Sequence, residues 1–399
     1  MRPLRERGCT PPAYPDTCPQ TEPVSHPGRP HHTNGPDGRG VVRRRTGTEP
    51  GRLRARWRGW TRRRRVVVCV CLAWGLLLLP VAAAAAALRL QYAGEPSAEA
   101  RTRGRDALWM GHAWVDGRRT GADLTALAAR LAGTGIHDLY VHTGPLEHDG
   151  SLRADRSPRA AQLVQDVHRL LPGVRVQAWL GDVVAPEKDG LHLDRADVRD
   201  RVTASARQVL DQGFDGVHFD MEPVHSGSAG FLALLDGVHA VTAARQVPFS
   251  VAAPQIDPLP GLHRVGLALT HHGKWWSQAY FGQVARRVDQ VAVMSYDTSM
   301  QLESLYGGYV AQQTALALEA TPADVDLLMG LPAYWEDDYS HRGSAETVTA
   351  AVRGARLALG RSDRQNFGLA LYVDFTATPA DWEAYRSGWC AGGAAAARR

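Results

Sequence analysis

Three ionisable side chains alternate along one apolar run of the sequence. The stretch GFDGVHFDMEPV, residues 213–224, carries His218, Asp220 and Glu222 two positions apart. Side chains alternate between the faces of a β-strand, so these three share one face and the apolar residues between them share the other. Residues two apart on a strand are separated by about 6.6 Å, too far for one tight carboxylate dyad but suited to two ends of one substrate. Ionised groups packed in this way are costly without partners or a function.

The surrounding sequence predicts the elements that hold this strand. GADLTALAARLAGTG, residues 121–135, has apolar residues at helical spacing. SPRAAQLVQDVHRLLPG, residues 157–173, has Ser157 as a predicted helix cap and Pro158 in the first turn. Candidate strands begin at residues 107, 136, 174, 214, 248, 288, 325 and 366. Their alternation with helices predicts an α/β fold, a closed parallel (β/α)8 TIM barrel over residues 105–390. A doubly wound sheet that bound a dinucleotide would need a Gly-rich phosphate loop, and the sequence has none.

Polar or aromatic residues stand where each predicted strand ends. Functional side chains of such barrels lie at the carboxyl ends of the strands. Any one of these residues is more often a packing residue, but their common phase across eight strands favours a site. In chain order they are His112, Trp114, His142, Trp179, Asp182, Asp220, Glu222, Gln255, Tyr296, Asp297, Tyr334, Trp335 and Asp374.

Three of these strand ends carry motifs that resemble one enzyme family. DGVHFDME is similar to the signature DGxDxDxE of family 18 glycoside hydrolases, the chitinases and their relatives, with Asp215, Gly216, Asp220 and Glu222 on the motif. MSYD, residues 294–297, is similar to the family's MxYD at the sixth strand, and MGLPAYW from residue 329 is similar to its GxPxYG at the seventh. All three occur in the family's order and spacing.

The resemblance implies substrate-assisted, retaining hydrolysis of a β-linked 2-acetamido sugar, an exception to the two-carboxylate scheme. Glu222 takes the position of the catalytic acid, with a pKa raised by burial and a neighbouring negative charge. Asp220 would orient the acetamido group, and Tyr296 would donate a hydrogen bond to its oxygen. No metal or other cofactor is expected, since no ligand spacing suggests one. The substrate-binding residues expected beside these are Asp215, His218, Met294, Asp297, Trp179, Tyr334, Trp335 and Tyr372.

The sequence departs from the family pattern at two positions. His218 stands where the motif has its middle Asp, as some cortex-lytic relatives also lack that Asp. A protonated His218 would hold Asp220 ionised, and activity would then depend on a group that titrates near neutrality. At the eighth strand Tyr372 takes the place of the family's floor Trp, and a Tyr covers less of a sugar ring. Classical chitin specificity is therefore less expected, and peptidoglycan, chitin and N-glycan all stay open as the N-acetylglucosamine-containing substrate.

Alternatives to this enzyme stay open at the level of sequence. One is a glycan-binding barrel that lost turnover through the His218 change, although the retained Glu222 speaks against it. Another is a conventional two-carboxylate glycosidase, in which Asp374 or Asp182 would face Glu222. Aromatic loop residues are candidate sugar platforms in each case, namely Trp275, Trp276 and Trp335.

The basic charge belongs to the N-terminal segment. Residues 1–65 hold 16 Arg, no Lys and five acidic residues, a net +11, and since the whole chain carries +5, residues 66–399 carry −6. Pro, Gly and Arg without apolar periodicity predict a disordered tail over residues 1–65, and residues 391–399 form a second such end. Nucleic-acid binding is disfavoured, because Arg runs beside an apolar span are usually topology signals.

Residues 66–88 contain no charge and are long enough to cross a hydrocarbon core of about 30 Å. The Arg run at 62–65 should stay cytoplasmic, which puts the barrel outside the cell after a linker at 89–104. A cleaved signal peptide that releases a secreted enzyme is the alternative, because alanines at 82–87 follow Pro80. Cys390 is the one cysteine after the span, so no disulfide is expected within the barrel. Oligomeric state has no signal in the sequence.

Overall fold

The computed structural model describes residues 61–390 of the chain. The segments expected to be disordered, residues 1–60 of the tail and 391–399, lie outside the described residues. Helix α2, Arg62–Tyr92, begins inside the predicted tail and continues into the predicted linker, with Pro80 within it. By length and composition it is apolar enough to cross a membrane. The chain separates into two compact units at the boundary between Cys69 and Val70. The barrel belongs to the second unit, which begins at Val70.

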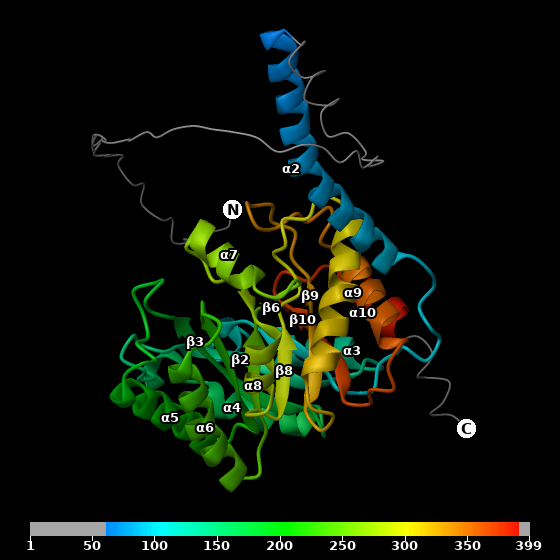
Figure 1. Ribbon diagram of the computed structural model, residues 1–399. Helices are drawn as coiled ribbons and strands as arrows, with labels where there is room; N and C mark the ends of the chain where they lie inside the picture. The colour runs from blue at the N-terminus through cyan, green and yellow to red at the C-terminus, as the bar shows by residue number, and fades with distance from the viewer. Residues whose placement is uncertain (1–60, 391–399) are drawn as a thin grey trace, which may run out of the picture. The chain divides into compact units, whose positions relative to one another are not determined.

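Within residues 61–390, eight parallel strands close a barrel (Figure 1) in the order β1-β10-β9-β8-β5-β4-β3-β2. The barrel strands are β1 Asp106–Met110, β2 Ile136–Pro145, β3 Arg175–Val183, β4 Gly216–Glu222, β5 Phe249–Ala253, β8 Gln290–Val293, β9 Asp326–Pro332 and β10 Phe367–Tyr372. Each begins within two residues of its predicted start, and the predicted (β/α)8 TIM barrel is confirmed. Because all pairings are parallel, the carboxyl ends of the strands meet at one end of the barrel, the mouth.

Helices follow the strands and cover the outside of the barrel. They are α3 Gly121–Leu131, α4 Ala160–Leu170, α5 Ala196–Asp211, α6 Ala229–Ala244, α8 Gln278–Ala285, α9 Glu303–Ala320, α10 Val348–Leu359 and α11 Pro379–Tyr385. Thr120 caps α3 in a reciprocal capping box with Asp123. The predicted start of α4 was wrong, because Pro158 and Arg159 form a turn and Arg159 is the residue before the helix.

Shorter elements complete the loops at the mouth. The chain leaves β5 through β6 Gln255–Ile256, α7 Leu262–Thr270 and β7 Trp275–Trp276, and β6 pairs with β7 in a separate two-stranded sheet. Two 3-10 turns, η1 His112–Trp114 and η2 Ala154–Arg156, follow β1 and β2, and a π-helical turn, η3 Arg386–Cys390, ends the described chain.

The apolar core has two parts. The larger one lies between strands and helices and contains side chains such as Phe219, Phe249 and Val251. The smaller one fills the barrel interior around Trp109 and Tyr140, where Trp179, Met294 and Tyr372 also pack. Residues of β4 therefore divide as the alternation predicted, with Phe219 outward and His218 among the interior side chains.

The last turn of α2 rests on the first turns of α9. A side chain on Gly308 would meet the Leu88 carbonyl oxygen at 2.0 Å, and one on Gly307 would meet the Tyr92 ring at 2.1 Å. The guanidinium of Arg353 in α10 lies 5.2 Å from the centre of the same Tyr92 ring and donates to the Gly94 carbonyl. Glycines thus let the backbones of α2 and α9 approach closely at this contact.

Candidate active site

The two carboxylates of β4 lie at the mouth of the barrel. Parallel pairing puts Asp220 beside Gly181 and Glu222 beside Val183, at the carboxyl end of β3. A side chain at position 181 would meet the Asp220 carbonyl oxygen at 2.2 Å, so glycine is needed there for the two strands to pair. The expected alternation therefore holds, and both carboxyls lie on the interior side of β4.

Both carboxyls hold their protons more tightly than free ones do. Burial raises the pKa of Asp220, and hydrogen bonding to the Trp179 indole opposes that shift. The pKa of Glu222 is raised more strongly, first by desolvation and then by the negative charges of Asp220 and Asp297. The residue is still accessible from the mouth, so a substrate can reach it. The Oδ1 atom of Asp220 is buried and has no hydrogen-bond partner in the described structure. The site thus combines a proton donor with a free acceptor.

His218 is buried and neutral. Its Nε2 accepts a hydrogen bond from the Trp109 indole at 3.0 Å, so Nδ1 carries the proton and donates to the Ser250 hydroxyl at 2.7 Å. Ser250 donates in turn to Gln177, and the imidazole stacks on Tyr140 with ring centres 3.8 Å apart. Burial lowers the pKa of His218 to about 3. Burial therefore favours a neutral His218, and the condition under which it would hold Asp220 ionised is not met.

Aromatic rings line the mouth around the carboxylates. Tyr372, at the end of β10, stacks on Tyr296 with ring centres 5.3 Å apart and lies edge-on to Tyr334 at 5.9 Å. The centres of the Trp179 and Tyr372 rings lie 6.3 Å apart, and Met294 packs into the same interior cluster. Tyr372 therefore contacts several of these rings, and its role as a sugar-facing floor stays a prediction.

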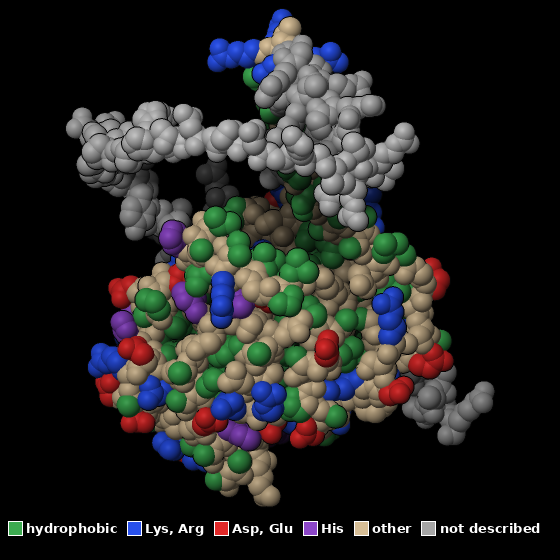
Figure 2. Space-filling view, viewed as in Figure 1, with side chains coloured by type: hydrophobic (Ala, Val, Ile, Leu, Met, Phe, Trp, Pro, Cys, Tyr) green, Lys and Arg blue, Asp and Glu red, His purple; other side chains and the backbone are tan. Residues whose placement is uncertain are grey.

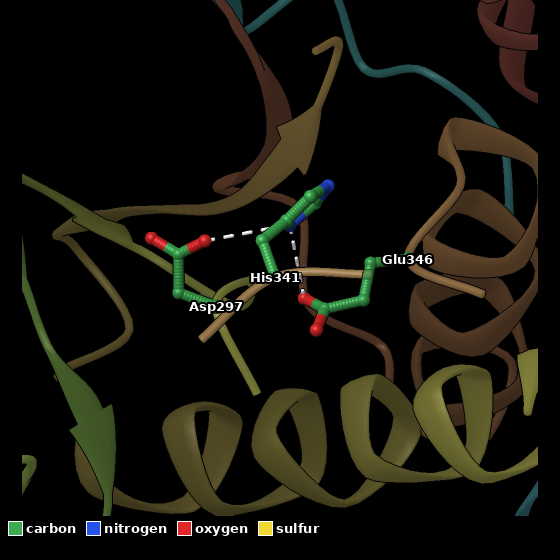
Figure 3. A group of neighbouring side chains, drawn as sticks. All are labelled: Asp297, His341 and Glu346. Carbon is green, nitrogen blue, oxygen red and sulfur yellow. Dashed lines mark ion pairs between the residues drawn. The ribbon is translucent and has the colours of Figure 1, made fainter. Parts of the chain in front are cut away.

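Asp297 belongs to an ion-pair cluster with His341 and Glu346 (Figure 3). The Tyr334 hydroxyl donates to Asp297 Oδ1 at 2.5 Å, and His341 Nδ1 lies 3.4 Å from the same oxygen and 3.5 Å from Glu346 Oε2. Glu346 is buried and accepts the backbone N–H of Thr298. Burial alone would lower the pKa of His341, but the two carboxylates outweigh it and raise the pKa to about 9. A protonated His341 therefore offsets part of their negative charge at neutral pH.

Among residues 61–390, these three residues are the group whose ligand atoms lie close enough together to hold a metal ion. One ligand atom from each of Asp297, His341 and Glu346 lies within 4.8 Å of the others. Lys274 adds a further cation here, since its Nζ donates to the Asp297 carbonyl at 3.1 Å. Two cations already face the two carboxylates, so the charges favour an ion-pair network over a divalent metal.

Three more residues were named from the sequence as contacts for substrate or sugar, and the structure places each of them differently. Asp215 lies at the amino end of β4, where its carboxylate accepts the Val176 N–H at 2.8 Å and pairs with His168. The prediction that it contacts substrate was wrong, because the motif runs the whole length of the strand. Trp276 is 1% exposed and donates to the Val224 carbonyl, so it is a core residue and no platform. Trp335 is 69% exposed at the rim.

The carboxylates weighed as partners of Glu222 are already bonded elsewhere. Asp374 accepts the Gly111 N–H and the Trp114 indole, one on each oxygen. Asp182 accepts the Val183 N–H on one oxygen, and His148 bonds the other. Neither carboxylate has the unpaired buried oxygen that Asp220 has, and this disfavours a conventional two-carboxylate pair.

The comparisons with known proteins agree with this geometry at the level of the fold. The spore cortex-lytic enzyme SleL of Bacillus megaterium superposes with a TM-score of 0.52 at 14% identity, over 74% of this chain and 76% of that one. The C-terminal domain of a putative chitinase from Desulfitobacterium hafniense gives 0.51 at 14% identity, over 72% and 98% of the two chains. The barrel is chitinase-like. No family model and no curated protein matches the sequence.

Several residues of this chitinase-like barrel were missed by reading the sequence. Trp109, Tyr140, Ser250 and Gln177 support His218 from four different strands, and each reads locally as ordinary strand interior. The period-two pattern places such residues inward, but only the register between strands brings them together. Outside the strands, His341 and Glu346 precede α10 without a local pattern.

Proposed function

We propose that the chain is a membrane-anchored extracellular glycoside hydrolase that cleaves β-linked N-acetylhexosamine glycans of peptidoglycan or chitin type. The observation that carries the proposal is the pair on β4: Glu222 with a raised pKa beside Asp220 with an unpaired buried oxygen. The resemblance of the strand-end motifs to family 18 glycoside hydrolases and the chitinase-like fold support the same activity.

The proposed reaction uses the substrate's own acetamido group as nucleophile. Glu222 protonates the glycosidic oxygen as the bond to the anomeric carbon breaks, and the acetamido oxygen forms the new bond to that carbon. Asp220 accepts the acetamido N–H with its unpaired oxygen and stabilises the positive oxazolinium ion. Tyr296 donates a hydrogen bond to the acetamido oxygen, and Tyr372 supports the sugar ring. Glu222, now a carboxylate, takes a proton from the water that opens the intermediate, so configuration is retained.

The anchor in this proposal is α2. Its apolar span would hold the barrel at the outer surface, with the Arg run at 62–65 on the cytoplasmic side. Removal of the span by a signal peptidase would give a secreted enzyme with the same site. Detection of the chain in membranes, resistant to carbonate extraction, tests the anchor separately from the chemistry.

Turnover of β-N-acetylglucosamine oligomers and of peptidoglycan by the full-length chain tests the activity. Glu222→Gln removes the acid and should lower kcat by about 10²–10⁴. Asp182→Asn is the matched control, a carboxylate at the neighbouring strand end that should keep activity within about threefold, because its hydrogen bonds are structural. Loss of activity in Asp182→Asn instead would favour a two-carboxylate pair. Sugar binding without turnover in the wild type would show a glycan-binding barrel.

A further inference from the structure

Helix α7 presents an apolar face to solvent at the mouth. None of its residues is buried, and Val265 and Leu269, one helical turn apart, are 53% and 78% exposed. Leu259, just before the helix, is 65% exposed. Figure 2 shows hydrophobic side chains over α7, with histidine and basic side chains beside them. An exposed apolar helix face of this kind marks an interaction surface.

This face belongs to a wider apolar rim. Outside α2, the exposed large hydrophobic side chains of the described residues all lie at or after the carboxyl end of a barrel strand. They are Val183, Leu259, Val265, Leu269, Leu302, Trp335, Tyr339 and Phe375. A random scatter would place some at the amino end of the barrel as well, so the exposed apolar side chains gather at the mouth end.

Two carboxylates, Asp257 and Glu187, hold α7 at its two ends. Asp257, which is 1% exposed, accepts the backbone N–H groups of Gly261 and His263, each at 2.9 Å. After the helix, Glu187 accepts the Gly273 N–H at 3.0 Å and pairs with His272. The apolar face is therefore presented by a fixed helix and is not a loose loop.

The apolar span of α2 ends at the same end of the barrel. Leu88 contacts Gly308, and Tyr92 contacts Gly307, both in the first two turns of α9. Helix α9 follows β8, so its first turns lie at the mouth, as does α7 (Figure 1). A bilayer that contained the span would thus meet the barrel at its mouth end.

The charges around α7 suit the same neighbour. Residues 258–274 contain Arg264, Lys274 and three histidines, and no Asp or Glu. Lys274 faces Asp297, and His263 and His272 pair with Asp257 and Glu187, which leaves Arg264 and His271 as the outward cationic groups. Arg264 is exposed beside Val265, and His271 is exposed just after the helix. Cationic groups that flank an apolar helix face are typical of helices that lie in a membrane interface, where they meet lipid phosphates.

We propose that α7 docks on the outer surface of the lipid bilayer, with Val265 and Leu269 inserted below the headgroups, so that the mouth faces the membrane. The inference rests on the proposed function and its uncleaved anchor. It narrows the substrate to glycan that lies within reach of the membrane surface.

Depth-dependent quenching in liposomes tests the docking without any need for turnover. The full-length chain, with its native cysteines replaced, carries one fluorophore at Leu269→Cys, and a matched protein carries it at Ala323→Cys, an exposed turn at the amino end of the barrel. In vesicles of equal parts phosphatidylcholine and phosphatidylglycerol, nitroxide-labelled lipids should quench the fluorophore at 269 about threefold or more above that at 323. Equal weak quenching would overturn the proposal. So would a shielded fluorophore at 269 that lipids do not quench, because this indicates a protein partner.

A second arm separates docking from activity. Val265→Ser with Leu269→Ser changes only exposed side chains, so turnover of a soluble oligomer should stay within about twofold. Turnover of the same oligomer linked to a lipid in the vesicles should fall by about tenfold, because the mouth no longer rests at the surface. Equal turnover of the lipid-linked oligomer by both proteins would overturn the docking. No turnover of the soluble oligomer by the wild type would overturn the proposed function and leave the quenching result standing.

Discussion

At the scale of single residues, the site depends on which groups keep their protons. Glu222 owes its raised pKa first to burial and then to two neighbouring carboxylates, Asp220 and Asp297. A general acid must be protonated when substrate binds, so these negative charges extend the working range of Glu222 toward higher pH. Burial in the barrel interior instead lowers the pKa of His218 and keeps its imidazole uncharged.

The first prediction concerns the basic limb of the pH profile. Replacing Asp220 with Asn removes the negative charge that has the larger effect on Glu222, so the pKa of Glu222 falls and the basic limb of kcat/KM moves to lower pH. Asp297→Asn should move the limb in the same direction by less. Profiles measured on the residual activity of both variants check this, and a basic limb that stays in place in Asp220→Asn contradicts it.

The second prediction concerns acid stability. His218 stays neutral in the fold down to about pH 3, whereas in the unfolded chain it takes up a proton near 6.5. The depressed pKa means that its contribution to stability is present above 6.5 and declines as the pH falls, by about 1.4 kcal/mol per unit. His218→Gln, which keeps a donor and an acceptor, should lose less stability between pH 6.5 and 4. Urea unfolding at several pH values measures this, with the exposed His192→Gln as the control. If the unfolding free energies of the wild type and His218→Gln depended on pH with equal slopes, His218 would not be neutral in the fold.

The third prediction concerns His341, whose contribution to stability should change with pH in the direction opposite to that of His218. The pKa of His341 is raised to about 9 in the fold, so its ion pairs stabilise the protein fully below about 6.5 and fade as the pH rises through 9. His341→Gln should therefore cost about 1–3 kcal/mol at pH 6.5 and almost nothing at pH 10. Unfolding free energies of the two proteins at both pH values decide it. A cost that does not change with pH would mean that His341 is neutral in the fold.

At the scale of elements, glycines set how closely the helices pack at the mouth. In α10 a side chain on Gly354 would meet the Gly307 carbonyl oxygen of α9 at 2.2 Å. In α6 a side chain on Gly237 would meet nothing nearer than the Thr203 hydroxyl at 3.5 Å. The two glycines are both inside helices and differ in what faces them, so they form a matched pair for testing the contact.

The fourth prediction uses that pair. Gly354→Ala should destabilise the protein by about 1–3 kcal/mol, because a backbone carbonyl must move to admit the methyl group. Gly237→Ala should be neutral or stabilise by up to about 1 kcal/mol, because alanine favours the helix. Thermal unfolding of both variants compares them. Similar effects at the two positions would show that α9 and α10 are not packed backbone against backbone.

At the scale of the whole molecule, the barrel was predictable and part of the site was not. Strands with apolar runs and helices with 3.6-residue spacing mark themselves locally, so all eight strand starts were found within two residues. The alternation along β4 also placed Asp220 and Glu222 on one face. A motif match says nothing of distance, however, and it assigned Asp215 to a site that lies a full strand length away.

Long-range pairing accounts for the contacts that residue types did not reveal. The neutral state of His218 depends on Trp109 and Ser250, which are 109 and 32 residues away. The charge on His341 depends on Asp297, contributed by the loop after another strand. Because register and loop conformation decide these contacts, local patterns along the chain are silent about them.

The close packing of α2 on α9 also affects how the barrel can move relative to the apolar span. A barrel joined to its span by a flexible linker would swivel and sample a volume around the attachment point. Here Gly308 lies against the Leu88 backbone and Gly307 against the Tyr92 ring, on which Arg353 also packs, and these contacts restrict that swivel. If α2 spans a bilayer, the catalyst meets its substrate by lateral diffusion in a plane, and its rate is set by glycan per unit area instead of glycan per unit volume.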